Sequence, residues 1–287
     1  MISGVASALP DSTTFIAMPV ASWTREPAFV MVPAYEGCGS WESGRMRHIG
    51  IHQYSVEGAV LCYSEIMHRA QGRLGEHQHP AVTMAGLAMA DTITEWDECD
   101  NDSLRARSAA VIERLASAGA DFFLCPDNTA HIALEAPGPD FALPGLHIGE
   151  VVADEAARRG FTRVGVLGTN WTMQGPVYPR ALGARSIGWA VPEAAVRSEL
   201  HRIIMDELCL GRFEEPSIRF YQQAIEALAA DGCDSVALVC TEIPLIISDG
   251  NSALPTLDST RLLAQAALDV ALGERPLPTW RGGAVQG

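Results

Sequence analysis

Several motifs that often reveal a protein's chemistry are missing from this sequence. Its seven cysteines form no C-x-x-C pair, and no histidine lies at zinc-finger spacing from them, which indicates a reduced chain rather than a disulfide or zinc framework. The sequence contains no G-x-G-x-x-G loop and no Walker loop, which argues against dinucleotide or nucleotide use. Its first residues do not show the basic region and apolar run that are typical of a signal peptide, so we expect none. No uncharged apolar run approaches the roughly 20 residues that a membrane helix needs. We therefore expect a cytoplasmic protein with no membrane partner.

Positive charge is also scarce. The net charge is −15, and the isoelectric point is about 4.9. Because such a chain repels nucleic acids and anionic membranes, we expect neither as a partner. With 287 residues, 48% of them hydrophobic and 19% charged, the chain is typical of a globular protein with two modest domains or one large one.

Short apolar runs alternate with longer helical patterns from Met46 onward, whereas residues 1–45 show no clear period. We leave open whether residues 1–45 are an extension or Met46 is the native start. The alternation of strands and helices predicts α/β structure with parallel sheets, in which ligands bind beyond the carboxyl ends of the strands. The expected strands are His48–Ile51, Ala81–Ala85, Phe122–Pro126, Gly145–Ile148, Val164–Leu167, Ser235–Val239 and a stretch before Pro255. The expected helices are Gly58–Ala70, Ser103–Ala118, Glu150–Arg159, Glu193–Leu210, Pro216–Ala230 and Asp258–Leu272.

Two segments of the chain resemble each other. Residues 112–121 (IERLASAGAD) and 225–234 (IEALAADGCD), which begin 113 positions apart, share six of ten residues without a gap. The same offset places Asp127 on Cys240 and Asn128 on Thr241, in polar loops after the two strands. We therefore expect two related units that aim Asp127 and Cys240 at one site from opposite sides.

Two opposed acid–base groups are what inversion of a stereocentre by proton transfer requires. One group removes a proton from one face, and the other returns a proton to the opposite face. The substrate carboxylate must also be stabilised while charge develops on it, and the hydroxyls of Thr129 and Thr241 are candidates for this role. Cys240 precedes Thr241 and Glu242, which are suitable residues for a helix start that would lower the pKa of a thiol.

The two loops are similar to known signatures. Residues 125–131 (CPDNTAH) resemble the first signature, Cys-Asn-Thr-x-His, of the aspartate/glutamate racemase superfamily, and residues 239–245 (VCTEIPL) resemble its second signature, Cys-Thr-Glu. Residues 165–169 (GVLGT) resemble the strand that opens the second half. The resemblance covers roughly residues 46–272. It implies two pseudo-symmetric α/β domains with parallel sheets and an active site in the cleft between them.

The resemblance also implies roles for particular residues. It implies catalysis without pyridoxal phosphate or metal, a small carboxylic acid as substrate with aspartate or glutamate as the default, and a homodimer. The last helix is expected to return to the first domain, so that residues 46–142 plus 256–287 form one domain and residues 143–255 the other. The catalytic candidates are Asp127 and Cys240, and the substrate-binding candidates are Tyr54, Ser55, Asn128, Thr129, Thr169, Thr241 and Glu242.

This chain departs from the first signature at one position. Asp127 stands where the family has its first cysteine, and we interpret the neighbouring Cys125 as buried strand. The departure leaves three functions open. The first is a racemase that uses Asp127 and Cys240. The second is a decarboxylase or isomerase of a dicarboxylic acid in which Cys240 alone moves a proton, and the third is a non-catalytic binding protein.

Overall fold

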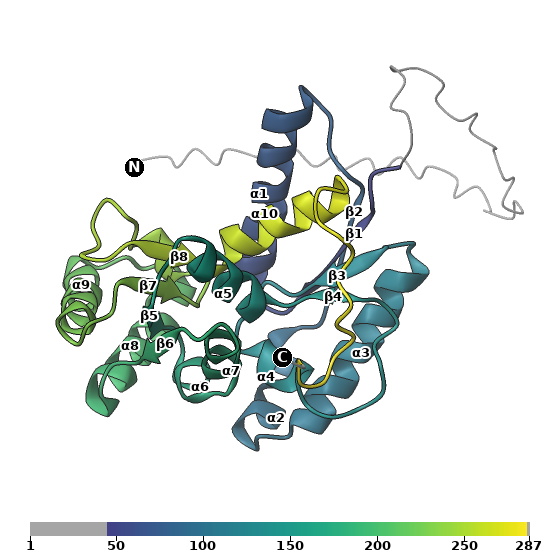
Figure 1. Ribbon diagram of the computed structural model, residues 1–287. Helices are drawn as coiled ribbons and strands as arrows, with labels where there is room; N and C mark the ends of the chain where they lie inside the picture. The colour runs from purple at the N-terminus through teal and green to yellow at the C-terminus, as the bar shows by residue number, and fades with distance from the viewer. Residues whose placement is uncertain (1–44, 286–287) are drawn as a thin grey trace, which may run out of the picture. The chain divides into compact units, whose positions relative to one another are not determined.

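The computed structural model describes residues 45–285 (Figure 1). The expected N-terminal extension, residues 1–45, lies outside the described residues except for Arg45. None of the helices within residues 45–285 is long and apolar enough to cross a membrane.

The first sheet has four parallel strands in the order β2-β1-β3-β4. All four were expected, although β3 and β4 are each two residues shorter than the predicted strand, and they lie in the first half of the described chain. They are β1 (Ile49–Gln53), β2 (Val82–Gly86), β3 (Phe122–Leu124) and β4 (Gly145–Leu146).

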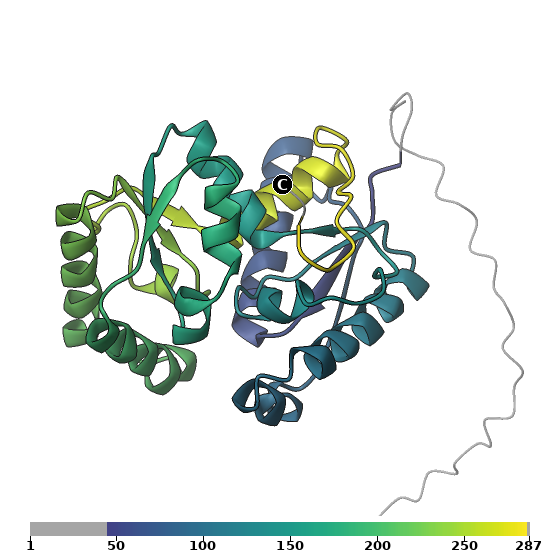
Figure 2. The same ribbon diagram turned by 60° about the horizontal axis from the view of Figure 1, so that its bottom comes forward.

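The second sheet is also parallel, and its order, β6-β5-β7-β8, repeats that of the first. Its strands are β5 (Arg163–Leu167), β6 (Gly188–Ala190), β7 (Ser235–Leu238) and β8 (Thr256–Asp258). The two sheets confirm the expected α/β class. They lie in two separate lobes in Figure 2.

The two equivalent aspartates of the sequence repeat occupy the same place in each sheet. The Asp121 carboxylate accepts a hydrogen bond from His48 N at 2.6 Å, and Asp121 N donates to His48 O. The Asp234 carboxylate accepts from Arg163 N at 3.2 Å, and Asp234 N donates to Arg163 O. Each aspartate thus joins the start of β3 or β7 to the start of the neighbouring strand, which explains why both copies keep it.

Helices cover both sheets. The longer helices were expected, and the shorter ones were not. They are α1 (Val56–Leu74), α2 (Ile93–Asp97), α3 (Asn101–Ser117), α4 (Ala130–Leu134), α5 (Ile148–Arg158), α6 (Asn170–Gln174), α7 (Val177–Gly183), α8 (Ala194–Asp206), α9 (Glu215–Ala230) and α10 (Ser259–Ala271), with 3-10 turns η1 (Met89–Asp91), η2 (Leu208–Leu210) and η3 (Ile243–Leu245).

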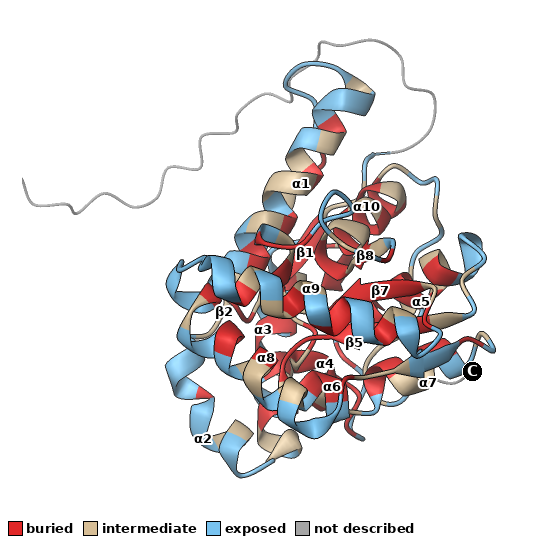
Figure 3. Cartoon of the chain, turned by 90° about the vertical axis from the view of Figure 1, so that its left-hand side faces the viewer, coloured by how far each residue is buried: buried red, intermediate tan, exposed pale blue. Residues whose placement is uncertain are grey.

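The last helix, α10, packs against α1, as the two adjacent helices in Figure 1 show. Leu263, Ala267 and Val270 of α10 share a buried core with Ile66 of α1 and Ile51 of β1. The last helix therefore packs on the first sheet. The central strands β1, β3, β5 and β7 and the inner faces of the helices are largely buried (Figure 3).

Helix α5 contributes to both cores. Ile148 and Val151 lie in the core that α10 completes, whereas Val152 and Ala156 lie in a core with strands of the second sheet. Because α5 joins the two cores, it does not mark a sharp domain boundary. We keep as a proposal that one domain consists of residues 46–142 plus 256–287 and the other of residues 143–255.

The sequence misplaced one strand and missed several short elements. The strand expected before Pro255 follows it instead, as β8. Proline has no N–H to donate within a sheet, but its carbonyl accepts from Val236 N at 2.9 Å, so Pro255 leads into the strand rather than ending it. The helix expected to reach Leu210 ends at Asp206 and is followed by η2, which Gly211 terminates in the left-handed conformation.

Candidate active site

Four loops that follow central strands meet at one place. They follow β1 and β3 of the first sheet and β5 and β7 of the second. Gly58, in the first turn of α1, packs so closely that an added Cβ would lie 2.5 Å from Pro126 O and 2.7 Å from Thr241 Cγ2. The two loops that carry Asp127 and Cys240 therefore contact the same residue.

Asp127 is partly buried and is oriented by the backbone. Its Oδ1 accepts a hydrogen bond from Ala130 N at 2.9 Å at the start of α4. Burial raises the pKa of the Asp127 carboxyl to about 6, the negative charge of Glu242 adds to the rise, and the N–H groups of Ala130 and Thr129 oppose it. A carboxylate with this pKa is ionised at neutral pH and can still take up a proton easily.

Cys240 has the opposite character. Its thiol donates to Glu242 Oε2 at 2.9 Å, and burial together with the Glu242 carboxylate raises the pKa of the thiol well above its usual value. The expectation of a helix start that lowers this pKa is wrong, because the buried Glu242 carboxylate lies next to the sulfur. At neutral pH the two candidates thus differ in state: Asp127 is a base, and Cys240 is a proton donor.

Three threonine hydroxyls from both halves of the chain form a cluster. Thr129 Oγ1 lies 3.1 Å from Thr169 Oγ1 and 2.9 Å from Thr172 Oγ1. Thr169 caps α6 by accepting from Thr172 N. Because a hydroxyl can rotate its hydrogen, this cluster can offer donors to a carboxylate. Thr172 had not been expected at the site, since nothing in its local sequence distinguishes it.

The loop after β1 is fixed by two contacts. The hydroxyl of Tyr54 accepts from Trp96 Nε1 of α2 at 3.0 Å, and Ser55 Oγ caps α1 by accepting from Gly58 N. Both residues are buried. Cys125, two residues before Asp127, is fully buried as expected, but it lies directly after β3 and not within the strand.

Both the oxygen and the nitrogen of the Asn128 side-chain amide form hydrogen bonds within the protein. Its Oδ1 accepts from the Tyr178 hydroxyl at 2.5 Å, and its Nδ2 donates to Ser259 Oγ at 3.0 Å. Ser259 Oγ in turn donates to Leu238 O at the end of β7. This chain of hydrogen bonds connects the Asp127 loop to the strand that leads to Cys240.

Helix α4 is supported by a pair of neutral histidines. His131 Nδ1 lies 2.8 Å from Asp127 O, and its Nε2 accepts from Ile148 N, so the proton is assigned to Nδ1. Burial and the neighbouring His147 lower the pKa of His131 well below its usual value. His131 is therefore a structural hydrogen-bonding residue under the Asp127 loop.

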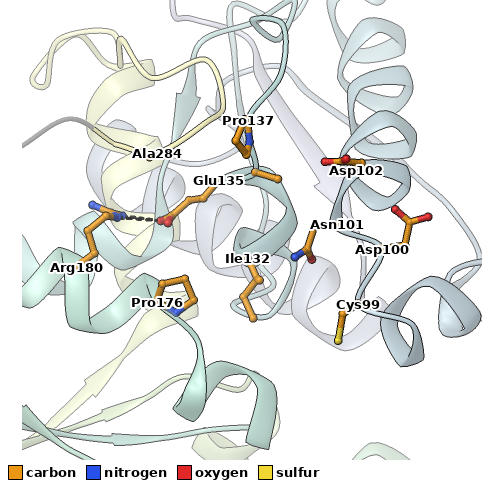
Figure 4. A pocket seen from close by; sticks show the side chains of 11 residues that line it. Cys99, Asp100, Asn101, Asp102, Ile132, Glu135, Pro137, Pro176, Arg180 and Ala284 are labelled. Atoms are coloured by element: carbon orange, nitrogen blue, oxygen red, sulfur yellow. Dashed lines mark hydrogen bonds and ion pairs between the residues drawn. The ribbon is translucent and has the colours of Figure 1, made fainter.

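A cavity of about 680 Å³ lies beside α4 (Figure 4). Figure 4 shows the paired Glu135 and Arg180 on one side of it and residues 99–102 on the other. None of the candidate site residues lines it. Within the described residues no group of three His, Cys, Asp or Glu side chains is placed to hold a metal ion.

Comparisons with known proteins agree with this arrangement. The model of the family Asp/Glu/Hydantoin racemase matches residues 51–267. The chain belongs to the Asp/Glu/Hydantoin racemase family. It is therefore an isomerase of the racemase type.

The individual relatives share only about a quarter of their residues with this chain. The broad specificity amino-acid racemase RacX of Bacillus subtilis (strain 168) is 23% identical over 177 residues, which are 60% of this chain and 74% of that protein. A putative Asp/Glu racemase from Yersinia pestis superposes with a TM-score of 0.71 and 27% identity over 79% of this chain and 100% of its own. An aspartate racemase homologue from Pyrococcus horikoshii OT3 gives 0.69 and 23% over the same shares, which shows a shared fold.

For this family member, Tyr178→Phe is expected to lower the free energy of unfolding by about 1–3 kcal/mol, because a buried amide oxygen loses its donor. Proton exchange at the substrate should slow as well, with an unchanged pH dependence, because Tyr178 positions Asn128 and does not react. Chemical unfolding and exchange kinetics measure both effects. Tyr63→Phe on α1 is the control, since Tyr63 is exposed. A Tyr178→Phe variant as stable as the wild type would contradict this role.

Proposed function

We propose that the protein racemises or epimerises an amino acid, or a similar small carboxylic acid, by proton transfer between Asp127 and Cys240. The observation that carries the proposal is the protonation state of Asp127 and Cys240, which occupy equivalent positions of the repeat: one is ionised and the other is protonated. The pKa of Asp127 is about 6, so its carboxyl is ionised at neutral pH. Burial and Glu242 raise the pKa of Cys240, so its thiol stays protonated and donates a hydrogen bond to Glu242. One base and one acid are thus available at once.

The proposed reaction removes the α-proton of the substrate to the Asp127 carboxylate and delivers the proton of the Cys240 thiol to the opposite face of the carbanion. In the reverse direction the thiolate removes the proton and the Asp127 carboxyl returns one. The developing negative charge lies on the substrate carboxylate, where hydroxyls of the threonine cluster can donate hydrogen bonds. Thr241 and the loop of Tyr54 and Ser55 complete the proposed binding site.

The sequence gives independent support for chemistry without pyridoxal phosphate. Enzymes that use this cofactor hold it as a Schiff base on a lysine. These 287 residues include twenty arginines but no lysine. The cofactor therefore has no lysine here to bind covalently.

The test is proton NMR of amino acids incubated with the protein in D2O. We expect the α-proton signal of at least one amino acid to disappear while the mirror isomer forms. Exchange at one isomer without formation of the other would indicate one-sided proton chemistry and contradict racemisation. No exchange with any L- or D-amino acid would overturn the proposal and favour malonate-type acids as substrates. Aspartate and glutamate are the substrates that the names of the structural relatives suggest first.

A further inference from the structure

The charged groups at the proposed site are all negative. Asp127 and Glu242 are close enough for the charge of Glu242 to raise the pKa of Asp127. Glu57 is exposed in the first turn of α1, directly before Gly58, which contacts both catalytic loops. Among the described residues, no cation is one of the main causes of the pKa shift of Asp127 or of Cys240.

The arginines of the described residues are engaged elsewhere. Nineteen of the twenty arginines lie within residues 45–285, and each donates a hydrogen bond to a group outside the proposed site. Arg180, which lines the cavity in Figure 4, is paired with Glu135 at 2.6 Å and with Glu150 at 2.5 Å. Arg25, the twentieth, lies outside the described residues.

The histidines near the site do not supply a positive charge. His201 accepts a hydrogen bond from Asn170 N, next to Thr169, and burial lowers its pKa. His52, at the end of β1, is fully buried, and burial lowers its pKa to about 4. His131 is neutral for the same reason. A substrate with a second carboxylate, such as aspartate or glutamate, would therefore find no cation to pair with in the described part of the chain.

We infer that the site selects amino acids whose side chain carries no negative charge and discriminates against aspartate and glutamate. This inference rests on the proposed function and concerns its substrate class. A side-chain carboxylate in this site would lose its water without gaining an ion pair, which is a large cost. It would also be repelled by Asp127, Glu242 and Glu57. A neutral amide has neither disadvantage, and a basic side chain would be attracted.

The experiment compares substrates that differ only in this charge. The pairs are asparagine with aspartate and glutamine with glutamate, each measured by α-proton exchange in D2O at low ionic strength, with arginine added as a basic substrate. We expect kcat/KM to be at least tenfold higher for each amide than for its acid, which corresponds to about 1.4 kcal/mol. An acid that is exchanged as fast as its amide or faster would overturn the inference and leave the proposed function standing. No exchange with any of the five would also overturn the inference, whereas the proposed function is overturned only if no L- or D-amino acid is exchanged.

A charge variant provides a second test. Glu57→Gln should increase kcat/KM for the acids by about two- to fivefold relative to the amides, because one of the repelling charges is removed. Glu113→Gln is the matched control. Glu113 is also exposed, but it lies near the end of α3 that leads into the start of β3, opposite to the site. An equal acid-to-amide ratio in Glu57→Gln and Glu113→Gln would contradict a role of the local charge.

Discussion

Asp127→Asn is expected to slow α-proton exchange by about 10²- to 10⁴-fold, the usual contribution of a positioned acid–base group. Asparagine has the same shape and can still accept the hydrogen bond from Ala130 N, so the loop should keep its structure. In the wild type, kcat/KM should fall below pH 6 as Asp127 becomes protonated. The residual activity of the variant should lack this acidic limb. Steady-state exchange rates between pH 5 and pH 8 measure both effects.

Asp127→Asn should also stabilise the protein at neutral pH. The pKa of this carboxyl is raised from about 3.8 to about 6 on folding, so ionised Asp127 is disfavoured in the folded state. Its stabilising contribution is complete below pH 4 and is lost as the pH rises through 6. Removing the charge should recover up to about 3 kcal/mol at pH 8 and little at pH 4.

Thermal unfolding at the two pH values checks this second effect. Asp97→Asn, at an exposed position at the end of α2, is the control and should change stability little at either pH. A variant at Asp127 that keeps full activity would show that the carboxylate is only a helix cap. A destabilised Asp127→Asn variant at pH 8 would contradict the assigned burial of an unpaired charge.

Cys240→Ala is expected to lower the rate at which the two isomers interconvert by about 10²- to 10⁴-fold, because no group remains to protonate the second face. Slow exchange of a single isomer should persist through Asp127. Asp127→Asn should leave slow exchange only of the opposite isomer, and the double variant should leave none. This opposite pattern distinguishes two opposed groups from a general loss of structure.

The measurement is separate α-proton exchange of the L and D isomers in D2O for each variant. Cys99→Ala is the matched control, since Cys99 is an exposed free cysteine. Full racemisation by Cys240→Ala would rule out Cys240 as the proton carrier. Loss of interconversion with unchanged exchange of both isomers would equally contradict the assignment.

The sequence alone determined the class of fold and predicted the two loops of the proposed site. Apolar runs that alternate with helical patterns are local features, and they placed all four strands of the first sheet and both central strands of the second. The repeat at 113 positions identified Asp127 and Cys240 as equivalent residues, because the same helix–strand–loop unit occurs twice. Short elements such as α4 and α6 had no comparable signal, since five residues cannot establish a helical period.

Tertiary structure decided how the site is held and charged. Asn128 bonds to Tyr178, 50 residues away, and to Ser259, 131 residues away, and no local pattern predicts such pairs. The expected lowering of the Cys240 pKa was reversed because folding buries the thiol beside Glu242. The charge at the site follows from the partners of the arginines, which the sequence does not reveal. Burial and long-range contact set these properties, because the energy of a charge depends on its surroundings in space and not on its neighbours in the chain.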